Sequence, residues 1–530
     1  MRRAVIIFLL AAIVALPFLL RPKVQAPGRT DDTVVIITPM NEAIRHEFEI
    51  GFESWYRAKT GRTVGVDWRV LGGTSEIVRF VQGQYVAAFQ NYWTGPLGRP
   101  WSTEVQSAFQ DGHLPDSASA SAKAARAAFL ASSVSCGLDV FFGGDTYNFQ
   151  KQAAAGSLVD GGLTRLHPDW FTPASFPATF DGEVYRDPDD RWFGCVTSSY
   201  GIMYNRDAVR RLGFDRPPAQ WADLADPRFL GEVALCDPTK SSSSATAFEN
   251  VLQQEMHRHL AAGEPEAAAV RAGWEEGLRL IQRIGANARY FTDSSQKPPI
   301  DVANGDCAAG MCIDFYGRQQ EEALRRRGAA GRMGFVAPPG GTAYSVDPIG
   351  LLRGAPNGGP ARAFLEYVLS LDGQKLWNFL PGTPGGPRDF ALRRLPVRKD
   401  FYDHGEWKPL RSDPDGAPYA GTEQLVYRPE WTASRFEELA FIIRIMCADT
   451  HNELVGAWKA INAVPEPARS QALVILQDMS AVTYDRAGGD LAQALTSRDQ
   501  VDAVQLAREL ADRFRRQYAH ATALAEGSRR

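Results

Sequence analysis

The chain has 530 residues, of which 44% are hydrophobic and 23% are charged. Domains typically hold on the order of 100–200 residues, so this length predicts two or three structural units with a core large enough to need no disulfides. Lys and Arg number 58 against 62 Asp and Glu, a formal net charge of -4, which excludes the basic footprint of a nucleic-acid-binding protein.

The N-terminus has the pattern of an export signal. Arg2 and Arg3 precede an apolar run at residues 4–20, and Arg21 follows it. A short basic segment before an apolar stretch is typical of a signal peptide. We expect residues 1–26 to be a signal peptide, with an uncleaved membrane anchor as the alternative, and the protein to be periplasmic or otherwise extracytoplasmic.

The cysteines fit no zinc site, and no C-x-x-C motif occurs. In an exported protein an even number of cysteines permits disulfides, whereas buried free thiols are the simpler interpretation. The six are Cys136, Cys195, Cys236, Cys307, Cys312 and Cys447.

The first part of the chain alternates strand and helix signals. Residues 33–37 form an apolar, β-branched run, typical of a strand buried on both faces of a parallel sheet. Apolar residues then recur at helical spacing through residues 44–56, and a second strand at residues 64–70 leads into another helix start. This βαβα order predicts an α/β fold with a mostly parallel sheet.

The middle of the chain predicts a second α/β unit. Residues 117–128, rich in Ser and Ala, are interpreted as a helical insertion, and strand signals return at residues 138–142 and 192–204. A short strand at residues 233–236 precedes a helix that opens at residues 241–244. We therefore expect the second unit to begin near the strand-like stretch at residues 192–204.

Later strands and helices complete the two units. Strands are expected at residues 309–314 and 345–350, and one amphipathic helix at residues 361–377. From about Asp400 strand signals vanish. Helices are predicted there at residues 436–447, 454–461, 470–484 and 501–518.

Three predicted strand-to-helix junctions concentrate small residues and hydroxyls. They are residues 38–42, residues 72–75 and residues 239–244. Helix N-termini expose unpaired N–H groups that bind anions, and ligands of open α/β sheets bind beyond the carboxyl ends of the strands. The junctions therefore predict an anionic or polyhydroxylated ligand, with ordinary helix capping as the alternative at each.

Residues 314–318 place a carboxylate, two aromatic rings and a guanidinium at a strand end. Tyr316 could donate a hydrogen bond to a ligand or, when ionised, serve as a hard oxygen ligand to a metal. The alternative is a buried Phe315 with Tyr316 at a surface rim.

Enzyme signatures are missing from the sequence. It contains no G-x-S-x-G, no Walker A motif, no H-E-x-x-H and no G-x-G-x-x-G. We therefore expect a binding protein without a cofactor. An exported hydrolase or transferase on a similar scaffold is an alternative.

Ordered segments of the chain resemble ABC-importer solute-binding proteins related to the ferric-iron-binding type. Trp221-Ala222-Asp223-Leu224 and Gly231 to Pro238 look like that family's W-x-D-L … G-x-[IV]-x-x-x-D-P pattern. Other matching segments are residues 34–39, 139–144, 200–205, 363–370, 373–374 and 395–398. Their joint order, rather than any one motif, carries the resemblance.

The resemblance implies a two-lobed periplasmic-binding-protein fold of the venus-flytrap type II, with the ligand between the lobes. We expect lobe 1 at residues 33–191 and 333–399, and lobe 2 at residues 192–332. Residues 400–530 would form a C-terminal helical extension that packs on lobe 1.

The chain departs from the iron-binding pattern at two places. The first loop, where iron-binding relatives use a His, is Pro39-Met40-Asn41-Glu42, and the family's Tyr-Tyr pair is here Phe315-Tyr316. The loss of two hard ligands disfavours a bare ferric ion. Family members that take phosphorylated sugars or phosphonates suggest an organophosphate-like ligand or a ferric–anion complex instead.

The resulting hypothesis is a monomeric solute-binding protein that delivers a small molecule to an inner-membrane ABC permease. A membrane-anchored ligand sensor is the alternative. The candidate ligand-binding residues are Asn41, Glu42, Gly73, Thr74, Ser75, Gly144, Ser199, Tyr200, Thr239, Ser241, Ser242, Asp314, Tyr316 and Asp347, with Tyr316 the one candidate metal ligand.

Overall fold

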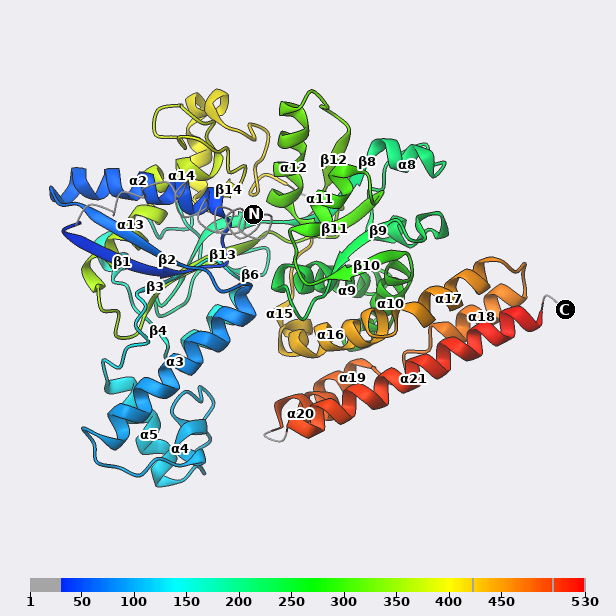
Figure 1. Cartoon of the computed structure of the whole chain (residues 1–530), viewed down its shortest axis with the longest axis horizontal. Helices are drawn as coiled ribbons and strands as arrows, with labels where there is room; N and C mark the ends of the chain where they lie inside the picture. The colour runs from blue at the N-terminus through cyan, green and yellow to red at the C-terminus, as the bar shows by residue number, and fades with distance from the viewer. Residues whose placement is uncertain (1–29, 422–423, 498–499, 529–530) are drawn as a thin grey trace, which may run out of the picture.

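The computed structural model describes residues 30–421, 424–497 and 500–528. The chain forms two α/β lobes, each built around its own mixed sheet, followed by C-terminal helices (Figure 1). This confirms the predicted two-lobed α/β fold with a helical C-terminal region. The predicted export signal at residues 1–26 lies outside the described residues.

The sheet of lobe 1 has three adjacent parallel strands at one side. Val34 of β1 pairs with Val66 of β2, Ile36 pairs with Val140 of β3, and the β1 residues Val34, Ile36 and Ile37 are fully buried. The strand order is β14-β7-β13-β3-β1-β2, with β4 on β13. The bounds are β1 (Asp32–Ile37), β2 (Val64–Arg69), β3 (Val140–Phe142), β4 (Leu158–Val159), β7 (Phe193–Ser198), β13 (Ser345–Leu352) and β14 (Leu395–Pro396).

The sheet of lobe 2 repeats this plan. Its order is β10-β9-β11-β8-β12, in which β10, β9 and β11 are parallel and β8 runs antiparallel to β11 and β12. The bounds are β8 (Tyr200–Asn205), β9 (Val233–Cys236), β10 (Ala288–Thr292), β11 (Ala309–Ile313) and β12 (Met333–Val336). A separate hairpin, β5 (Thr179–Phe180) and β6 (Glu183–Val184), belongs to neither sheet.

Helices cover both sheets, and α3 leads away from lobe 1 to a small helical arm formed with α4 and α5 (Figure 1). That arm matches the predicted helical insertion. The helices of lobe 1 are α2 (Glu42–Thr60), α3 (Thr74–Thr94), α4 (Thr103–Ala108), α5 (Ala120–Ala131), α6 (Thr146–Ala155), α7 (Leu163–Leu166), α13 (Gly358–Leu369) and α14 (Leu371–Asn378). Those of lobe 2 are α8 (Arg206–Arg211), α9 (Ser242–Ala261), α10 (Glu266–Ala286), α11 (Lys297–Asn304) and α12 (Asp314–Arg326).

The single helix predicted at residues 361–377 is two helices. The break falls at Ser370, whose hydroxyl accepts a hydrogen bond from the Gly373 N–H at 3.2 Å and so caps α14. A Cβ on Gly373 would lie 2.1 Å from the Tyr367 carbonyl oxygen. The apolar periodicity continues through both helices, so only the capping serine and the glycine mark the break.

The chain passes between the lobes at positions that differ from the predicted boundaries. Strand β7 pairs with β13 and β14 of lobe 1, whereas β8 pairs with β11 of lobe 2, so the first crossing lies at Ser199 rather than at Trp192. Strand β12 still pairs with β8, so the return lies within residues 337–344 rather than before Met333. Buried apolar strands have the same pattern in either sheet, so the sequence alone could not place these crossings.

The prediction that the C-terminal helices pack on lobe 1 is wrong. They lie along lobe 2 (Figure 1), where the Trp274 indole of α10 donates to the Val482 carbonyl at 2.9 Å and the Trp458 indole donates to Asn287 at 2.9 Å. The helices are α15 (Pro429–Thr432), α16 (Phe436–Ile443), α17 (His451–Asn462), α18 (Ala468–Leu476), α19 (Tyr484–Arg486), α20 (Ala492–Thr496) and α21 (Gln500–Gly527). Helix α10 contacts them at further points: Gln282 donates to the Tyr518 hydroxyl at 3.1 Å, and a Cβ on Gly285 would lie 2.9 Å from Cys447.

The first part of the extension stays on lobe 1, where the Arg411 guanidinium donates to the Asn378 side chain at 2.8 Å. Two later residues also contact lobe 1: the Tyr427 N–H donates to the Asp181 carbonyl at 2.8 Å, and Glu437 pairs with Lys151 of α6 at 2.7 Å. All six cysteines are buried and unpaired. Within the described ranges, no helix is both long enough and apolar enough to cross a membrane.

The contact between α17 and lobe 2 is testable by substitution. Trp458→Ala removes a buried indole and its bond to Asn287, and it should lower the free energy of unfolding by about 3–5 kcal/mol. Urea unfolding at equilibrium measures this. Val474→Ala on α18, a site that is 74% exposed, is the control and should change stability by less than about 0.5 kcal/mol. Equal effects of the two substitutions would contradict the packing.

Candidate ligand-binding site

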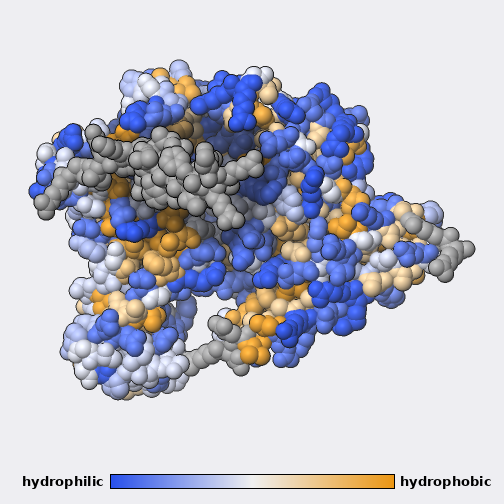
Figure 2. All heavy atoms as spheres, in the orientation of Figure 1, coloured by the Kyte–Doolittle hydropathy of each residue, from blue (hydrophilic) through white to orange (hydrophobic). Residues whose placement is uncertain are grey.

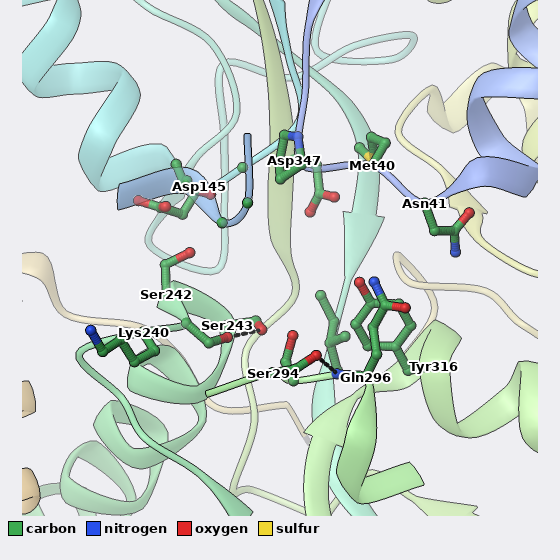
Figure 3. Close-up of a pocket in the computed structure, with 18 of the residues that line it drawn as sticks. Met40, Asn41, Asp145, Lys240, Ser242, Ser243, Ser294, Gln296, Tyr316 and Asp347 are labelled. Atoms are coloured by element: carbon green, nitrogen blue, oxygen red, sulfur yellow. Dashed lines mark hydrogen bonds between the residues drawn. The ribbon is translucent and has the colours of Figure 1, made fainter. Parts of the chain in front are cut away.

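A cavity of about 540 Å³ lies between the lobes, and its walls are the segments that follow six strand ends. From lobe 1 these are the loops after β1, β2 and β3, and from lobe 2 the loops after β9, β10 and β11. Ligands of open α/β sheets bind at this end of the strands. In Figure 3 the side chains of Asp145, Asp347, Met40 and Asn41 lie on one side of the gap, and those of Ser242, Ser243, Ser294 and Tyr316 lie on the other.

The lobe 1 wall is built from two helix starts and a glycine. Asn41 caps α2 by accepting from the Ile44 N–H at 3.1 Å, whereas α3 starts at Gly73 with no side-chain cap. Gly144 has φ +131°, and a Cβ there would lie 3.0 Å from Thr74 Cγ2. Only glycine fits this position, which keeps the start of α3 accessible from the cavity.

The lobe 2 wall is the N-terminus of α9. Ser241 caps the helix by accepting from the Ser244 N–H at 3.4 Å, and its hydroxyl also lies 3.0 Å from that of Ser243. The Ser242 hydroxyl points across the gap towards Asp145 (Figure 3). A helix start with hydroxyls on its first turn favours negative charge through its N–H groups and dipole.

The two walls touch at the edge of the cavity. A Cβ on Gly73 would lie 3.2 Å from the Lys240 carbonyl oxygen, so the starts of α3 and α9 are in close approach. The Asn41 amide donates to Gln319 of α12 at 3.4 Å, which adds a second contact across the gap. Hydrophilic side chains surround the gap in Figure 2.

A buried ion pair lies behind the cavity. Arg394 has a fully buried side chain and donates to Asp347 at 2.7 Å, while Ser198 donates to the other Asp347 oxygen at 3.1 Å. The guanidinium also lies over the ring of Phe315, 4.2 Å from its centroid. Arg394 therefore fixes the Asp347 carboxylate at the cavity wall and contacts a lobe 2 aromatic ring.

Two more ionisable groups face the gap in buried surroundings. Asp145 caps α6 by accepting from the Asn148 N–H at 2.8 Å, and burial raises the pKa of its carboxyl. Burial also raises the pKa of Tyr316 to about 12. The phenol is therefore protonated near neutral pH and suited to donating a hydrogen bond.

A cluster of metal-ligand type lies outside the cavity lining. In the described part of the chain, the one group of three His, Cys, Asp or Glu side chains with ligand atoms within 4.8 Å of one another is His46, Glu47 and Asp389. The Glu47 carboxylate already accepts from the N–H groups of Asp389 and Phe390, each at 2.7 Å. This cluster therefore holds the 388–390 loop. Two tyrosines line the cavity itself, Tyr316 after β11 and Tyr200 at the start of β8, and the Tyr200 hydroxyl lies 3.1 Å from that of Ser345.

Most of the predicted site residues lie in the cavity lining. These are Asn41, Glu42, Gly73, Thr74, Gly144, Tyr200, Ser241, Ser242, Tyr316 and Asp347. Ser75, Ser199, Thr239 and Asp314 do not line it. Ser199 and Asp314 are instead buried and bonded to each other at 3.3 Å, and Thr239 donates to Asp237 at 2.7 Å.

Sequence reasoning missed several lining residues. Met40, Arg45, Asp145 and residues 293–296 also line the cavity. Asp145 directly follows the glycine pair after β3, so its place before a helix was a usable signal. The 293–296 loop follows β10, a strand with only partial burial that gave no clear apolar run.

Comparison with known proteins agrees with this architecture. Residues 138–393 match the model of the family described as bacterial extracellular solute-binding protein.

Curated relatives match parts of the chain. An uncharacterized protein of Haemophilus influenzae is 29% identical over 242 residues, 45% of this chain and 60% of that protein. The phosphoglycerate transport regulatory protein of Salmonella typhimurium is 24% identical over 202 residues, 38% and 44% of the two chains. Iron uptake protein A2 of Synechocystis is 28% identical over 223 residues, which are 40% of this chain and 58% of that protein. The matches thus span between 44% and 60% of these relatives' lengths.

Solved structures similar to the chain include two periplasmic binding proteins. The fructose-6-phosphate-bound protein AfuA of Actinobacillus pleuropneumoniae is 16% identical, with a TM-score of 0.46 over 81% of this chain and 98% of that one. The apo ferric ion-binding protein A of Pasteurella haemolytica is 14% identical, with a TM-score of 0.47 over 77% of this chain and 95% of that one.

The Arg394–Asp347 pair gives a stability prediction. Arg394→Met leaves the Asp347 charge buried and unpaired, so the free energy of unfolding should fall by about 3–5 kcal/mol in chemical denaturation. Arg62→Met is the control, because that arginine is 55% exposed in its pair with Asp32 and should cost at most about 1 kcal/mol. Adding Asp347→Asn to Arg394→Met should restore part of the loss. No recovery would contradict a direct pairing.

Proposed function

We propose that the chain is the extracytoplasmic solute-binding protein of an ABC importer and that it binds a small anionic ligand between its lobes. The observation that carries the proposal is the convergence of the N-termini of α2, α3 and α9 on one cavity, two from lobe 1 and one from lobe 2. Such helix starts favour anions, and their placement on both lobes lets one ligand contact both.

One relative supports an anionic cargo, because it is named for phosphoglycerate transport. Another is named for iron uptake, which is compatible with a ferric–anion complex. The cavity has two tyrosines, Tyr200 and Tyr316, which are not adjacent in the chain as in the iron-binding pattern, and no three-ligand cluster of His, Cys, Asp and Glu is found around it in the described residues. An organophosphate-like ligand or a ferric–anion complex fits these groups better than a bare ferric ion.

Binding would act by closing the lobes. A ligand that contacts Ser242 and Thr74 together binds the closed arrangement more tightly than the open one, and this difference in affinity shifts the population to the closed state. The closed, loaded form is the form that would be delivered to an inner-membrane permease. The protein would act as a monomer, exported from the cytoplasm, and would perform no chemistry on its cargo.

A ligand sensor is the second candidate. The relative from Salmonella is named a transport regulatory protein, and here the C-terminal helices cover one side of lobe 2. A sensor would keep residues 1–26 as an anchor. N-terminal sequencing of the mature protein from membrane and soluble fractions separates the two: loss of these residues favours the importer component, and their retention in the membrane fraction favours the sensor.

The anion site can be tested with a ligand panel. Ser241→Ala with Ser242→Ala removes two hydroxyls at the α9 start, and it should weaken binding of the responding anion about tenfold or more. A ligand at a hundredfold excess over its Kd stabilises the folded state by about 2.7 kcal/mol, so thermal unfolding with hexose phosphates, phosphonates and ferric citrate measures the response.

The control for this panel is Ser470→Ala, at an exposed serine on α18 outside the cavity. It should leave every ligand response unchanged. Equal ligand responses of the wild type and of the double variant would remove the α9 start from the site.

A further inference from the structure

A second, smaller cavity adjoins the main one. Its volume is about 50 Å³, and Asp145 and Tyr200 line both cavities. Lobe 1 contributes the β5–β6 hairpin, the start of α6 and β13, lobe 2 contributes α9 and the start of β8, and the C-terminal extension contributes residues 427–436. We call it the Glu183 pocket, after the hairpin residue that lines it.

The Glu183 carboxylate is the unusual feature of this pocket. The residue is 5% exposed, and within the described ranges no hydrogen bond or ion pair reaches its side chain. A buried carboxylate without a partner is costly, and native proteins rarely keep one unless a ligand or proton satisfies it.

A second buried carboxyl comes from the opposite lobe. Glu249 of α9 is 3% exposed, and its Oε1 accepts from the Tyr427 hydroxyl at 2.9 Å and from the Thr432 hydroxyl at 2.5 Å. Burial and the neighbouring Glu249 raise the pKa of Glu183 to about 8, and burial raises that of Glu249 to about 7. The two carboxyls therefore line a common pocket, and the described residues that line it include no Lys, Arg or His.

The remaining walls favour an organic cation over a metal ion. The rings of Tyr147, Tyr200, Tyr427 and Phe436 line the pocket. Aromatic faces together with carboxylates are the groups that recognise ammonium ions. In the described residues these acids are not part of a group of three His, Cys, Asp or Glu side chains whose ligand atoms lie within 4.8 Å of one another. At roughly 10–15 Å³ for each water position, the volume suits an ammonium group with one or two carbons.

The extension holds this pocket in place. The Tyr427 N–H donates to the Asp181 carbonyl at 2.8 Å, and a Cβ on Gly182 (φ +83°) would lie only 1.7 Å from the Tyr427 carbonyl oxygen. Gln253 of α9 donates to the Arg428 carbonyl at 2.9 Å. One short segment of the extension thus fixes the hairpin and α9 around the pocket.

We propose that the Glu183 pocket binds a protonated primary amine, with the carboxylates of Glu183 and Glu249 as its counter-ions. Because Asp145 and Tyr200 line both cavities, the amine can be one end of a ligand whose anionic group lies at the starts of α3 and α9. In that form the inference rests on the proposed function. A small amine that is not part of the cleft ligand would bind through the same two carboxylates.

The test uses the full chain and calorimetric titration with ethylammonium chloride and with the matched pair phosphoethanolamine and ethyl phosphate. The wild type should bind at least one of the two amines, and phosphoethanolamine should bind about tenfold more tightly than ethyl phosphate where the amine belongs to the cleft ligand. Glu183→Gln should abolish the response to ethylammonium and the advantage of phosphoethanolamine. Glu104→Gln, at an exposed site on α4, should abolish neither.

The outcomes separate the two proposals. Binding of ethylammonium alone, lost in Glu183→Gln, supports a separate amine ligand. Loss of the phosphoethanolamine advantage, with ethyl phosphate still bound, supports an amine on the cleft ligand. Amine binding that survives in Glu183→Gln, or no amine binding by the wild type, overturns the pocket proposal. Ethyl phosphate binding reports on the anion site independently. Glu249→Gln, which keeps an oxygen acceptor for Tyr427, repeats the test from the other lobe.

The same carboxyl predicts a pH dependence of stability. The titratable groups around Glu183 are those in the pocket lining, Glu249, Asp145, Tyr147, Tyr200 and Tyr427, together with Tyr185. Its pKa of about 8 in the folded protein exceeds the unfolded value of 4.5, so the folded state holds more protons between those values. The free energy of unfolding should therefore fall as pH rises from 4.5 to 8. In Glu183→Gln the fall should be smaller, and an identical slope in denaturant titrations across this range would contradict a buried, unpaired carboxyl.

Discussion

Backbone N–H groups at the starts of α2, α3 and α9 can point at one ligand only because the carboxyl ends of two sheets face each other. Each lobe contributes three parallel strands, and the loop after every one of the six reaches the same cavity. A parallel strand followed by a helix places the helix start at the strand's carboxyl end. The site therefore needs no motif of its own, because it arises where two ordinary α/β units meet.

The crossings between the lobes decide how such a site works. Ser199 joins β7 of one sheet directly to β8 of the other, and the Tyr200 N–H donates to Thr342, on the return crossing, at 3.0 Å. The extension adds a third crossing, because the Leu425 N–H donates to the Thr342 carbonyl at 3.1 Å before the chain continues onto α9. These three crossing segments are hydrogen-bonded to one another, so relative motion of the lobes must bend all three together.

The sequence predicted the fold well where burial pattern and order were decisive. The β-branched run of β1, the glycines after β3 and the serines before α9 all placed elements and cavity residues correctly. It failed where the deciding information was long-range. The pattern of β7 and β8 does not say which sheet each joins, and nothing local to Arg394 indicates that it pairs with Asp347.

The extension shows the same limit. Its helices were evident from their periodicity, but the surface that they cover is set by which lobe has unburied apolar residues, and α10 supplies these through Trp274 and Leu278. Ser199 and Asp314 were predicted as ligand contacts on chemical type alone. The structure pairs them with each other behind the cavity, where their polarity is satisfied internally.

The central claim is that a ligand bridges the lobes and closes them. Electron–electron double resonance between spin labels on α2 (Ser54→Cys) and directly after α12 (Arg327→Cys) measures the interlobe distance directly, and the native cysteines are buried. Addition of the anion that most stabilises the protein should shift the distance distribution to a single, shorter and narrower population. A distribution unchanged at saturating ligand would contradict closure between the lobes.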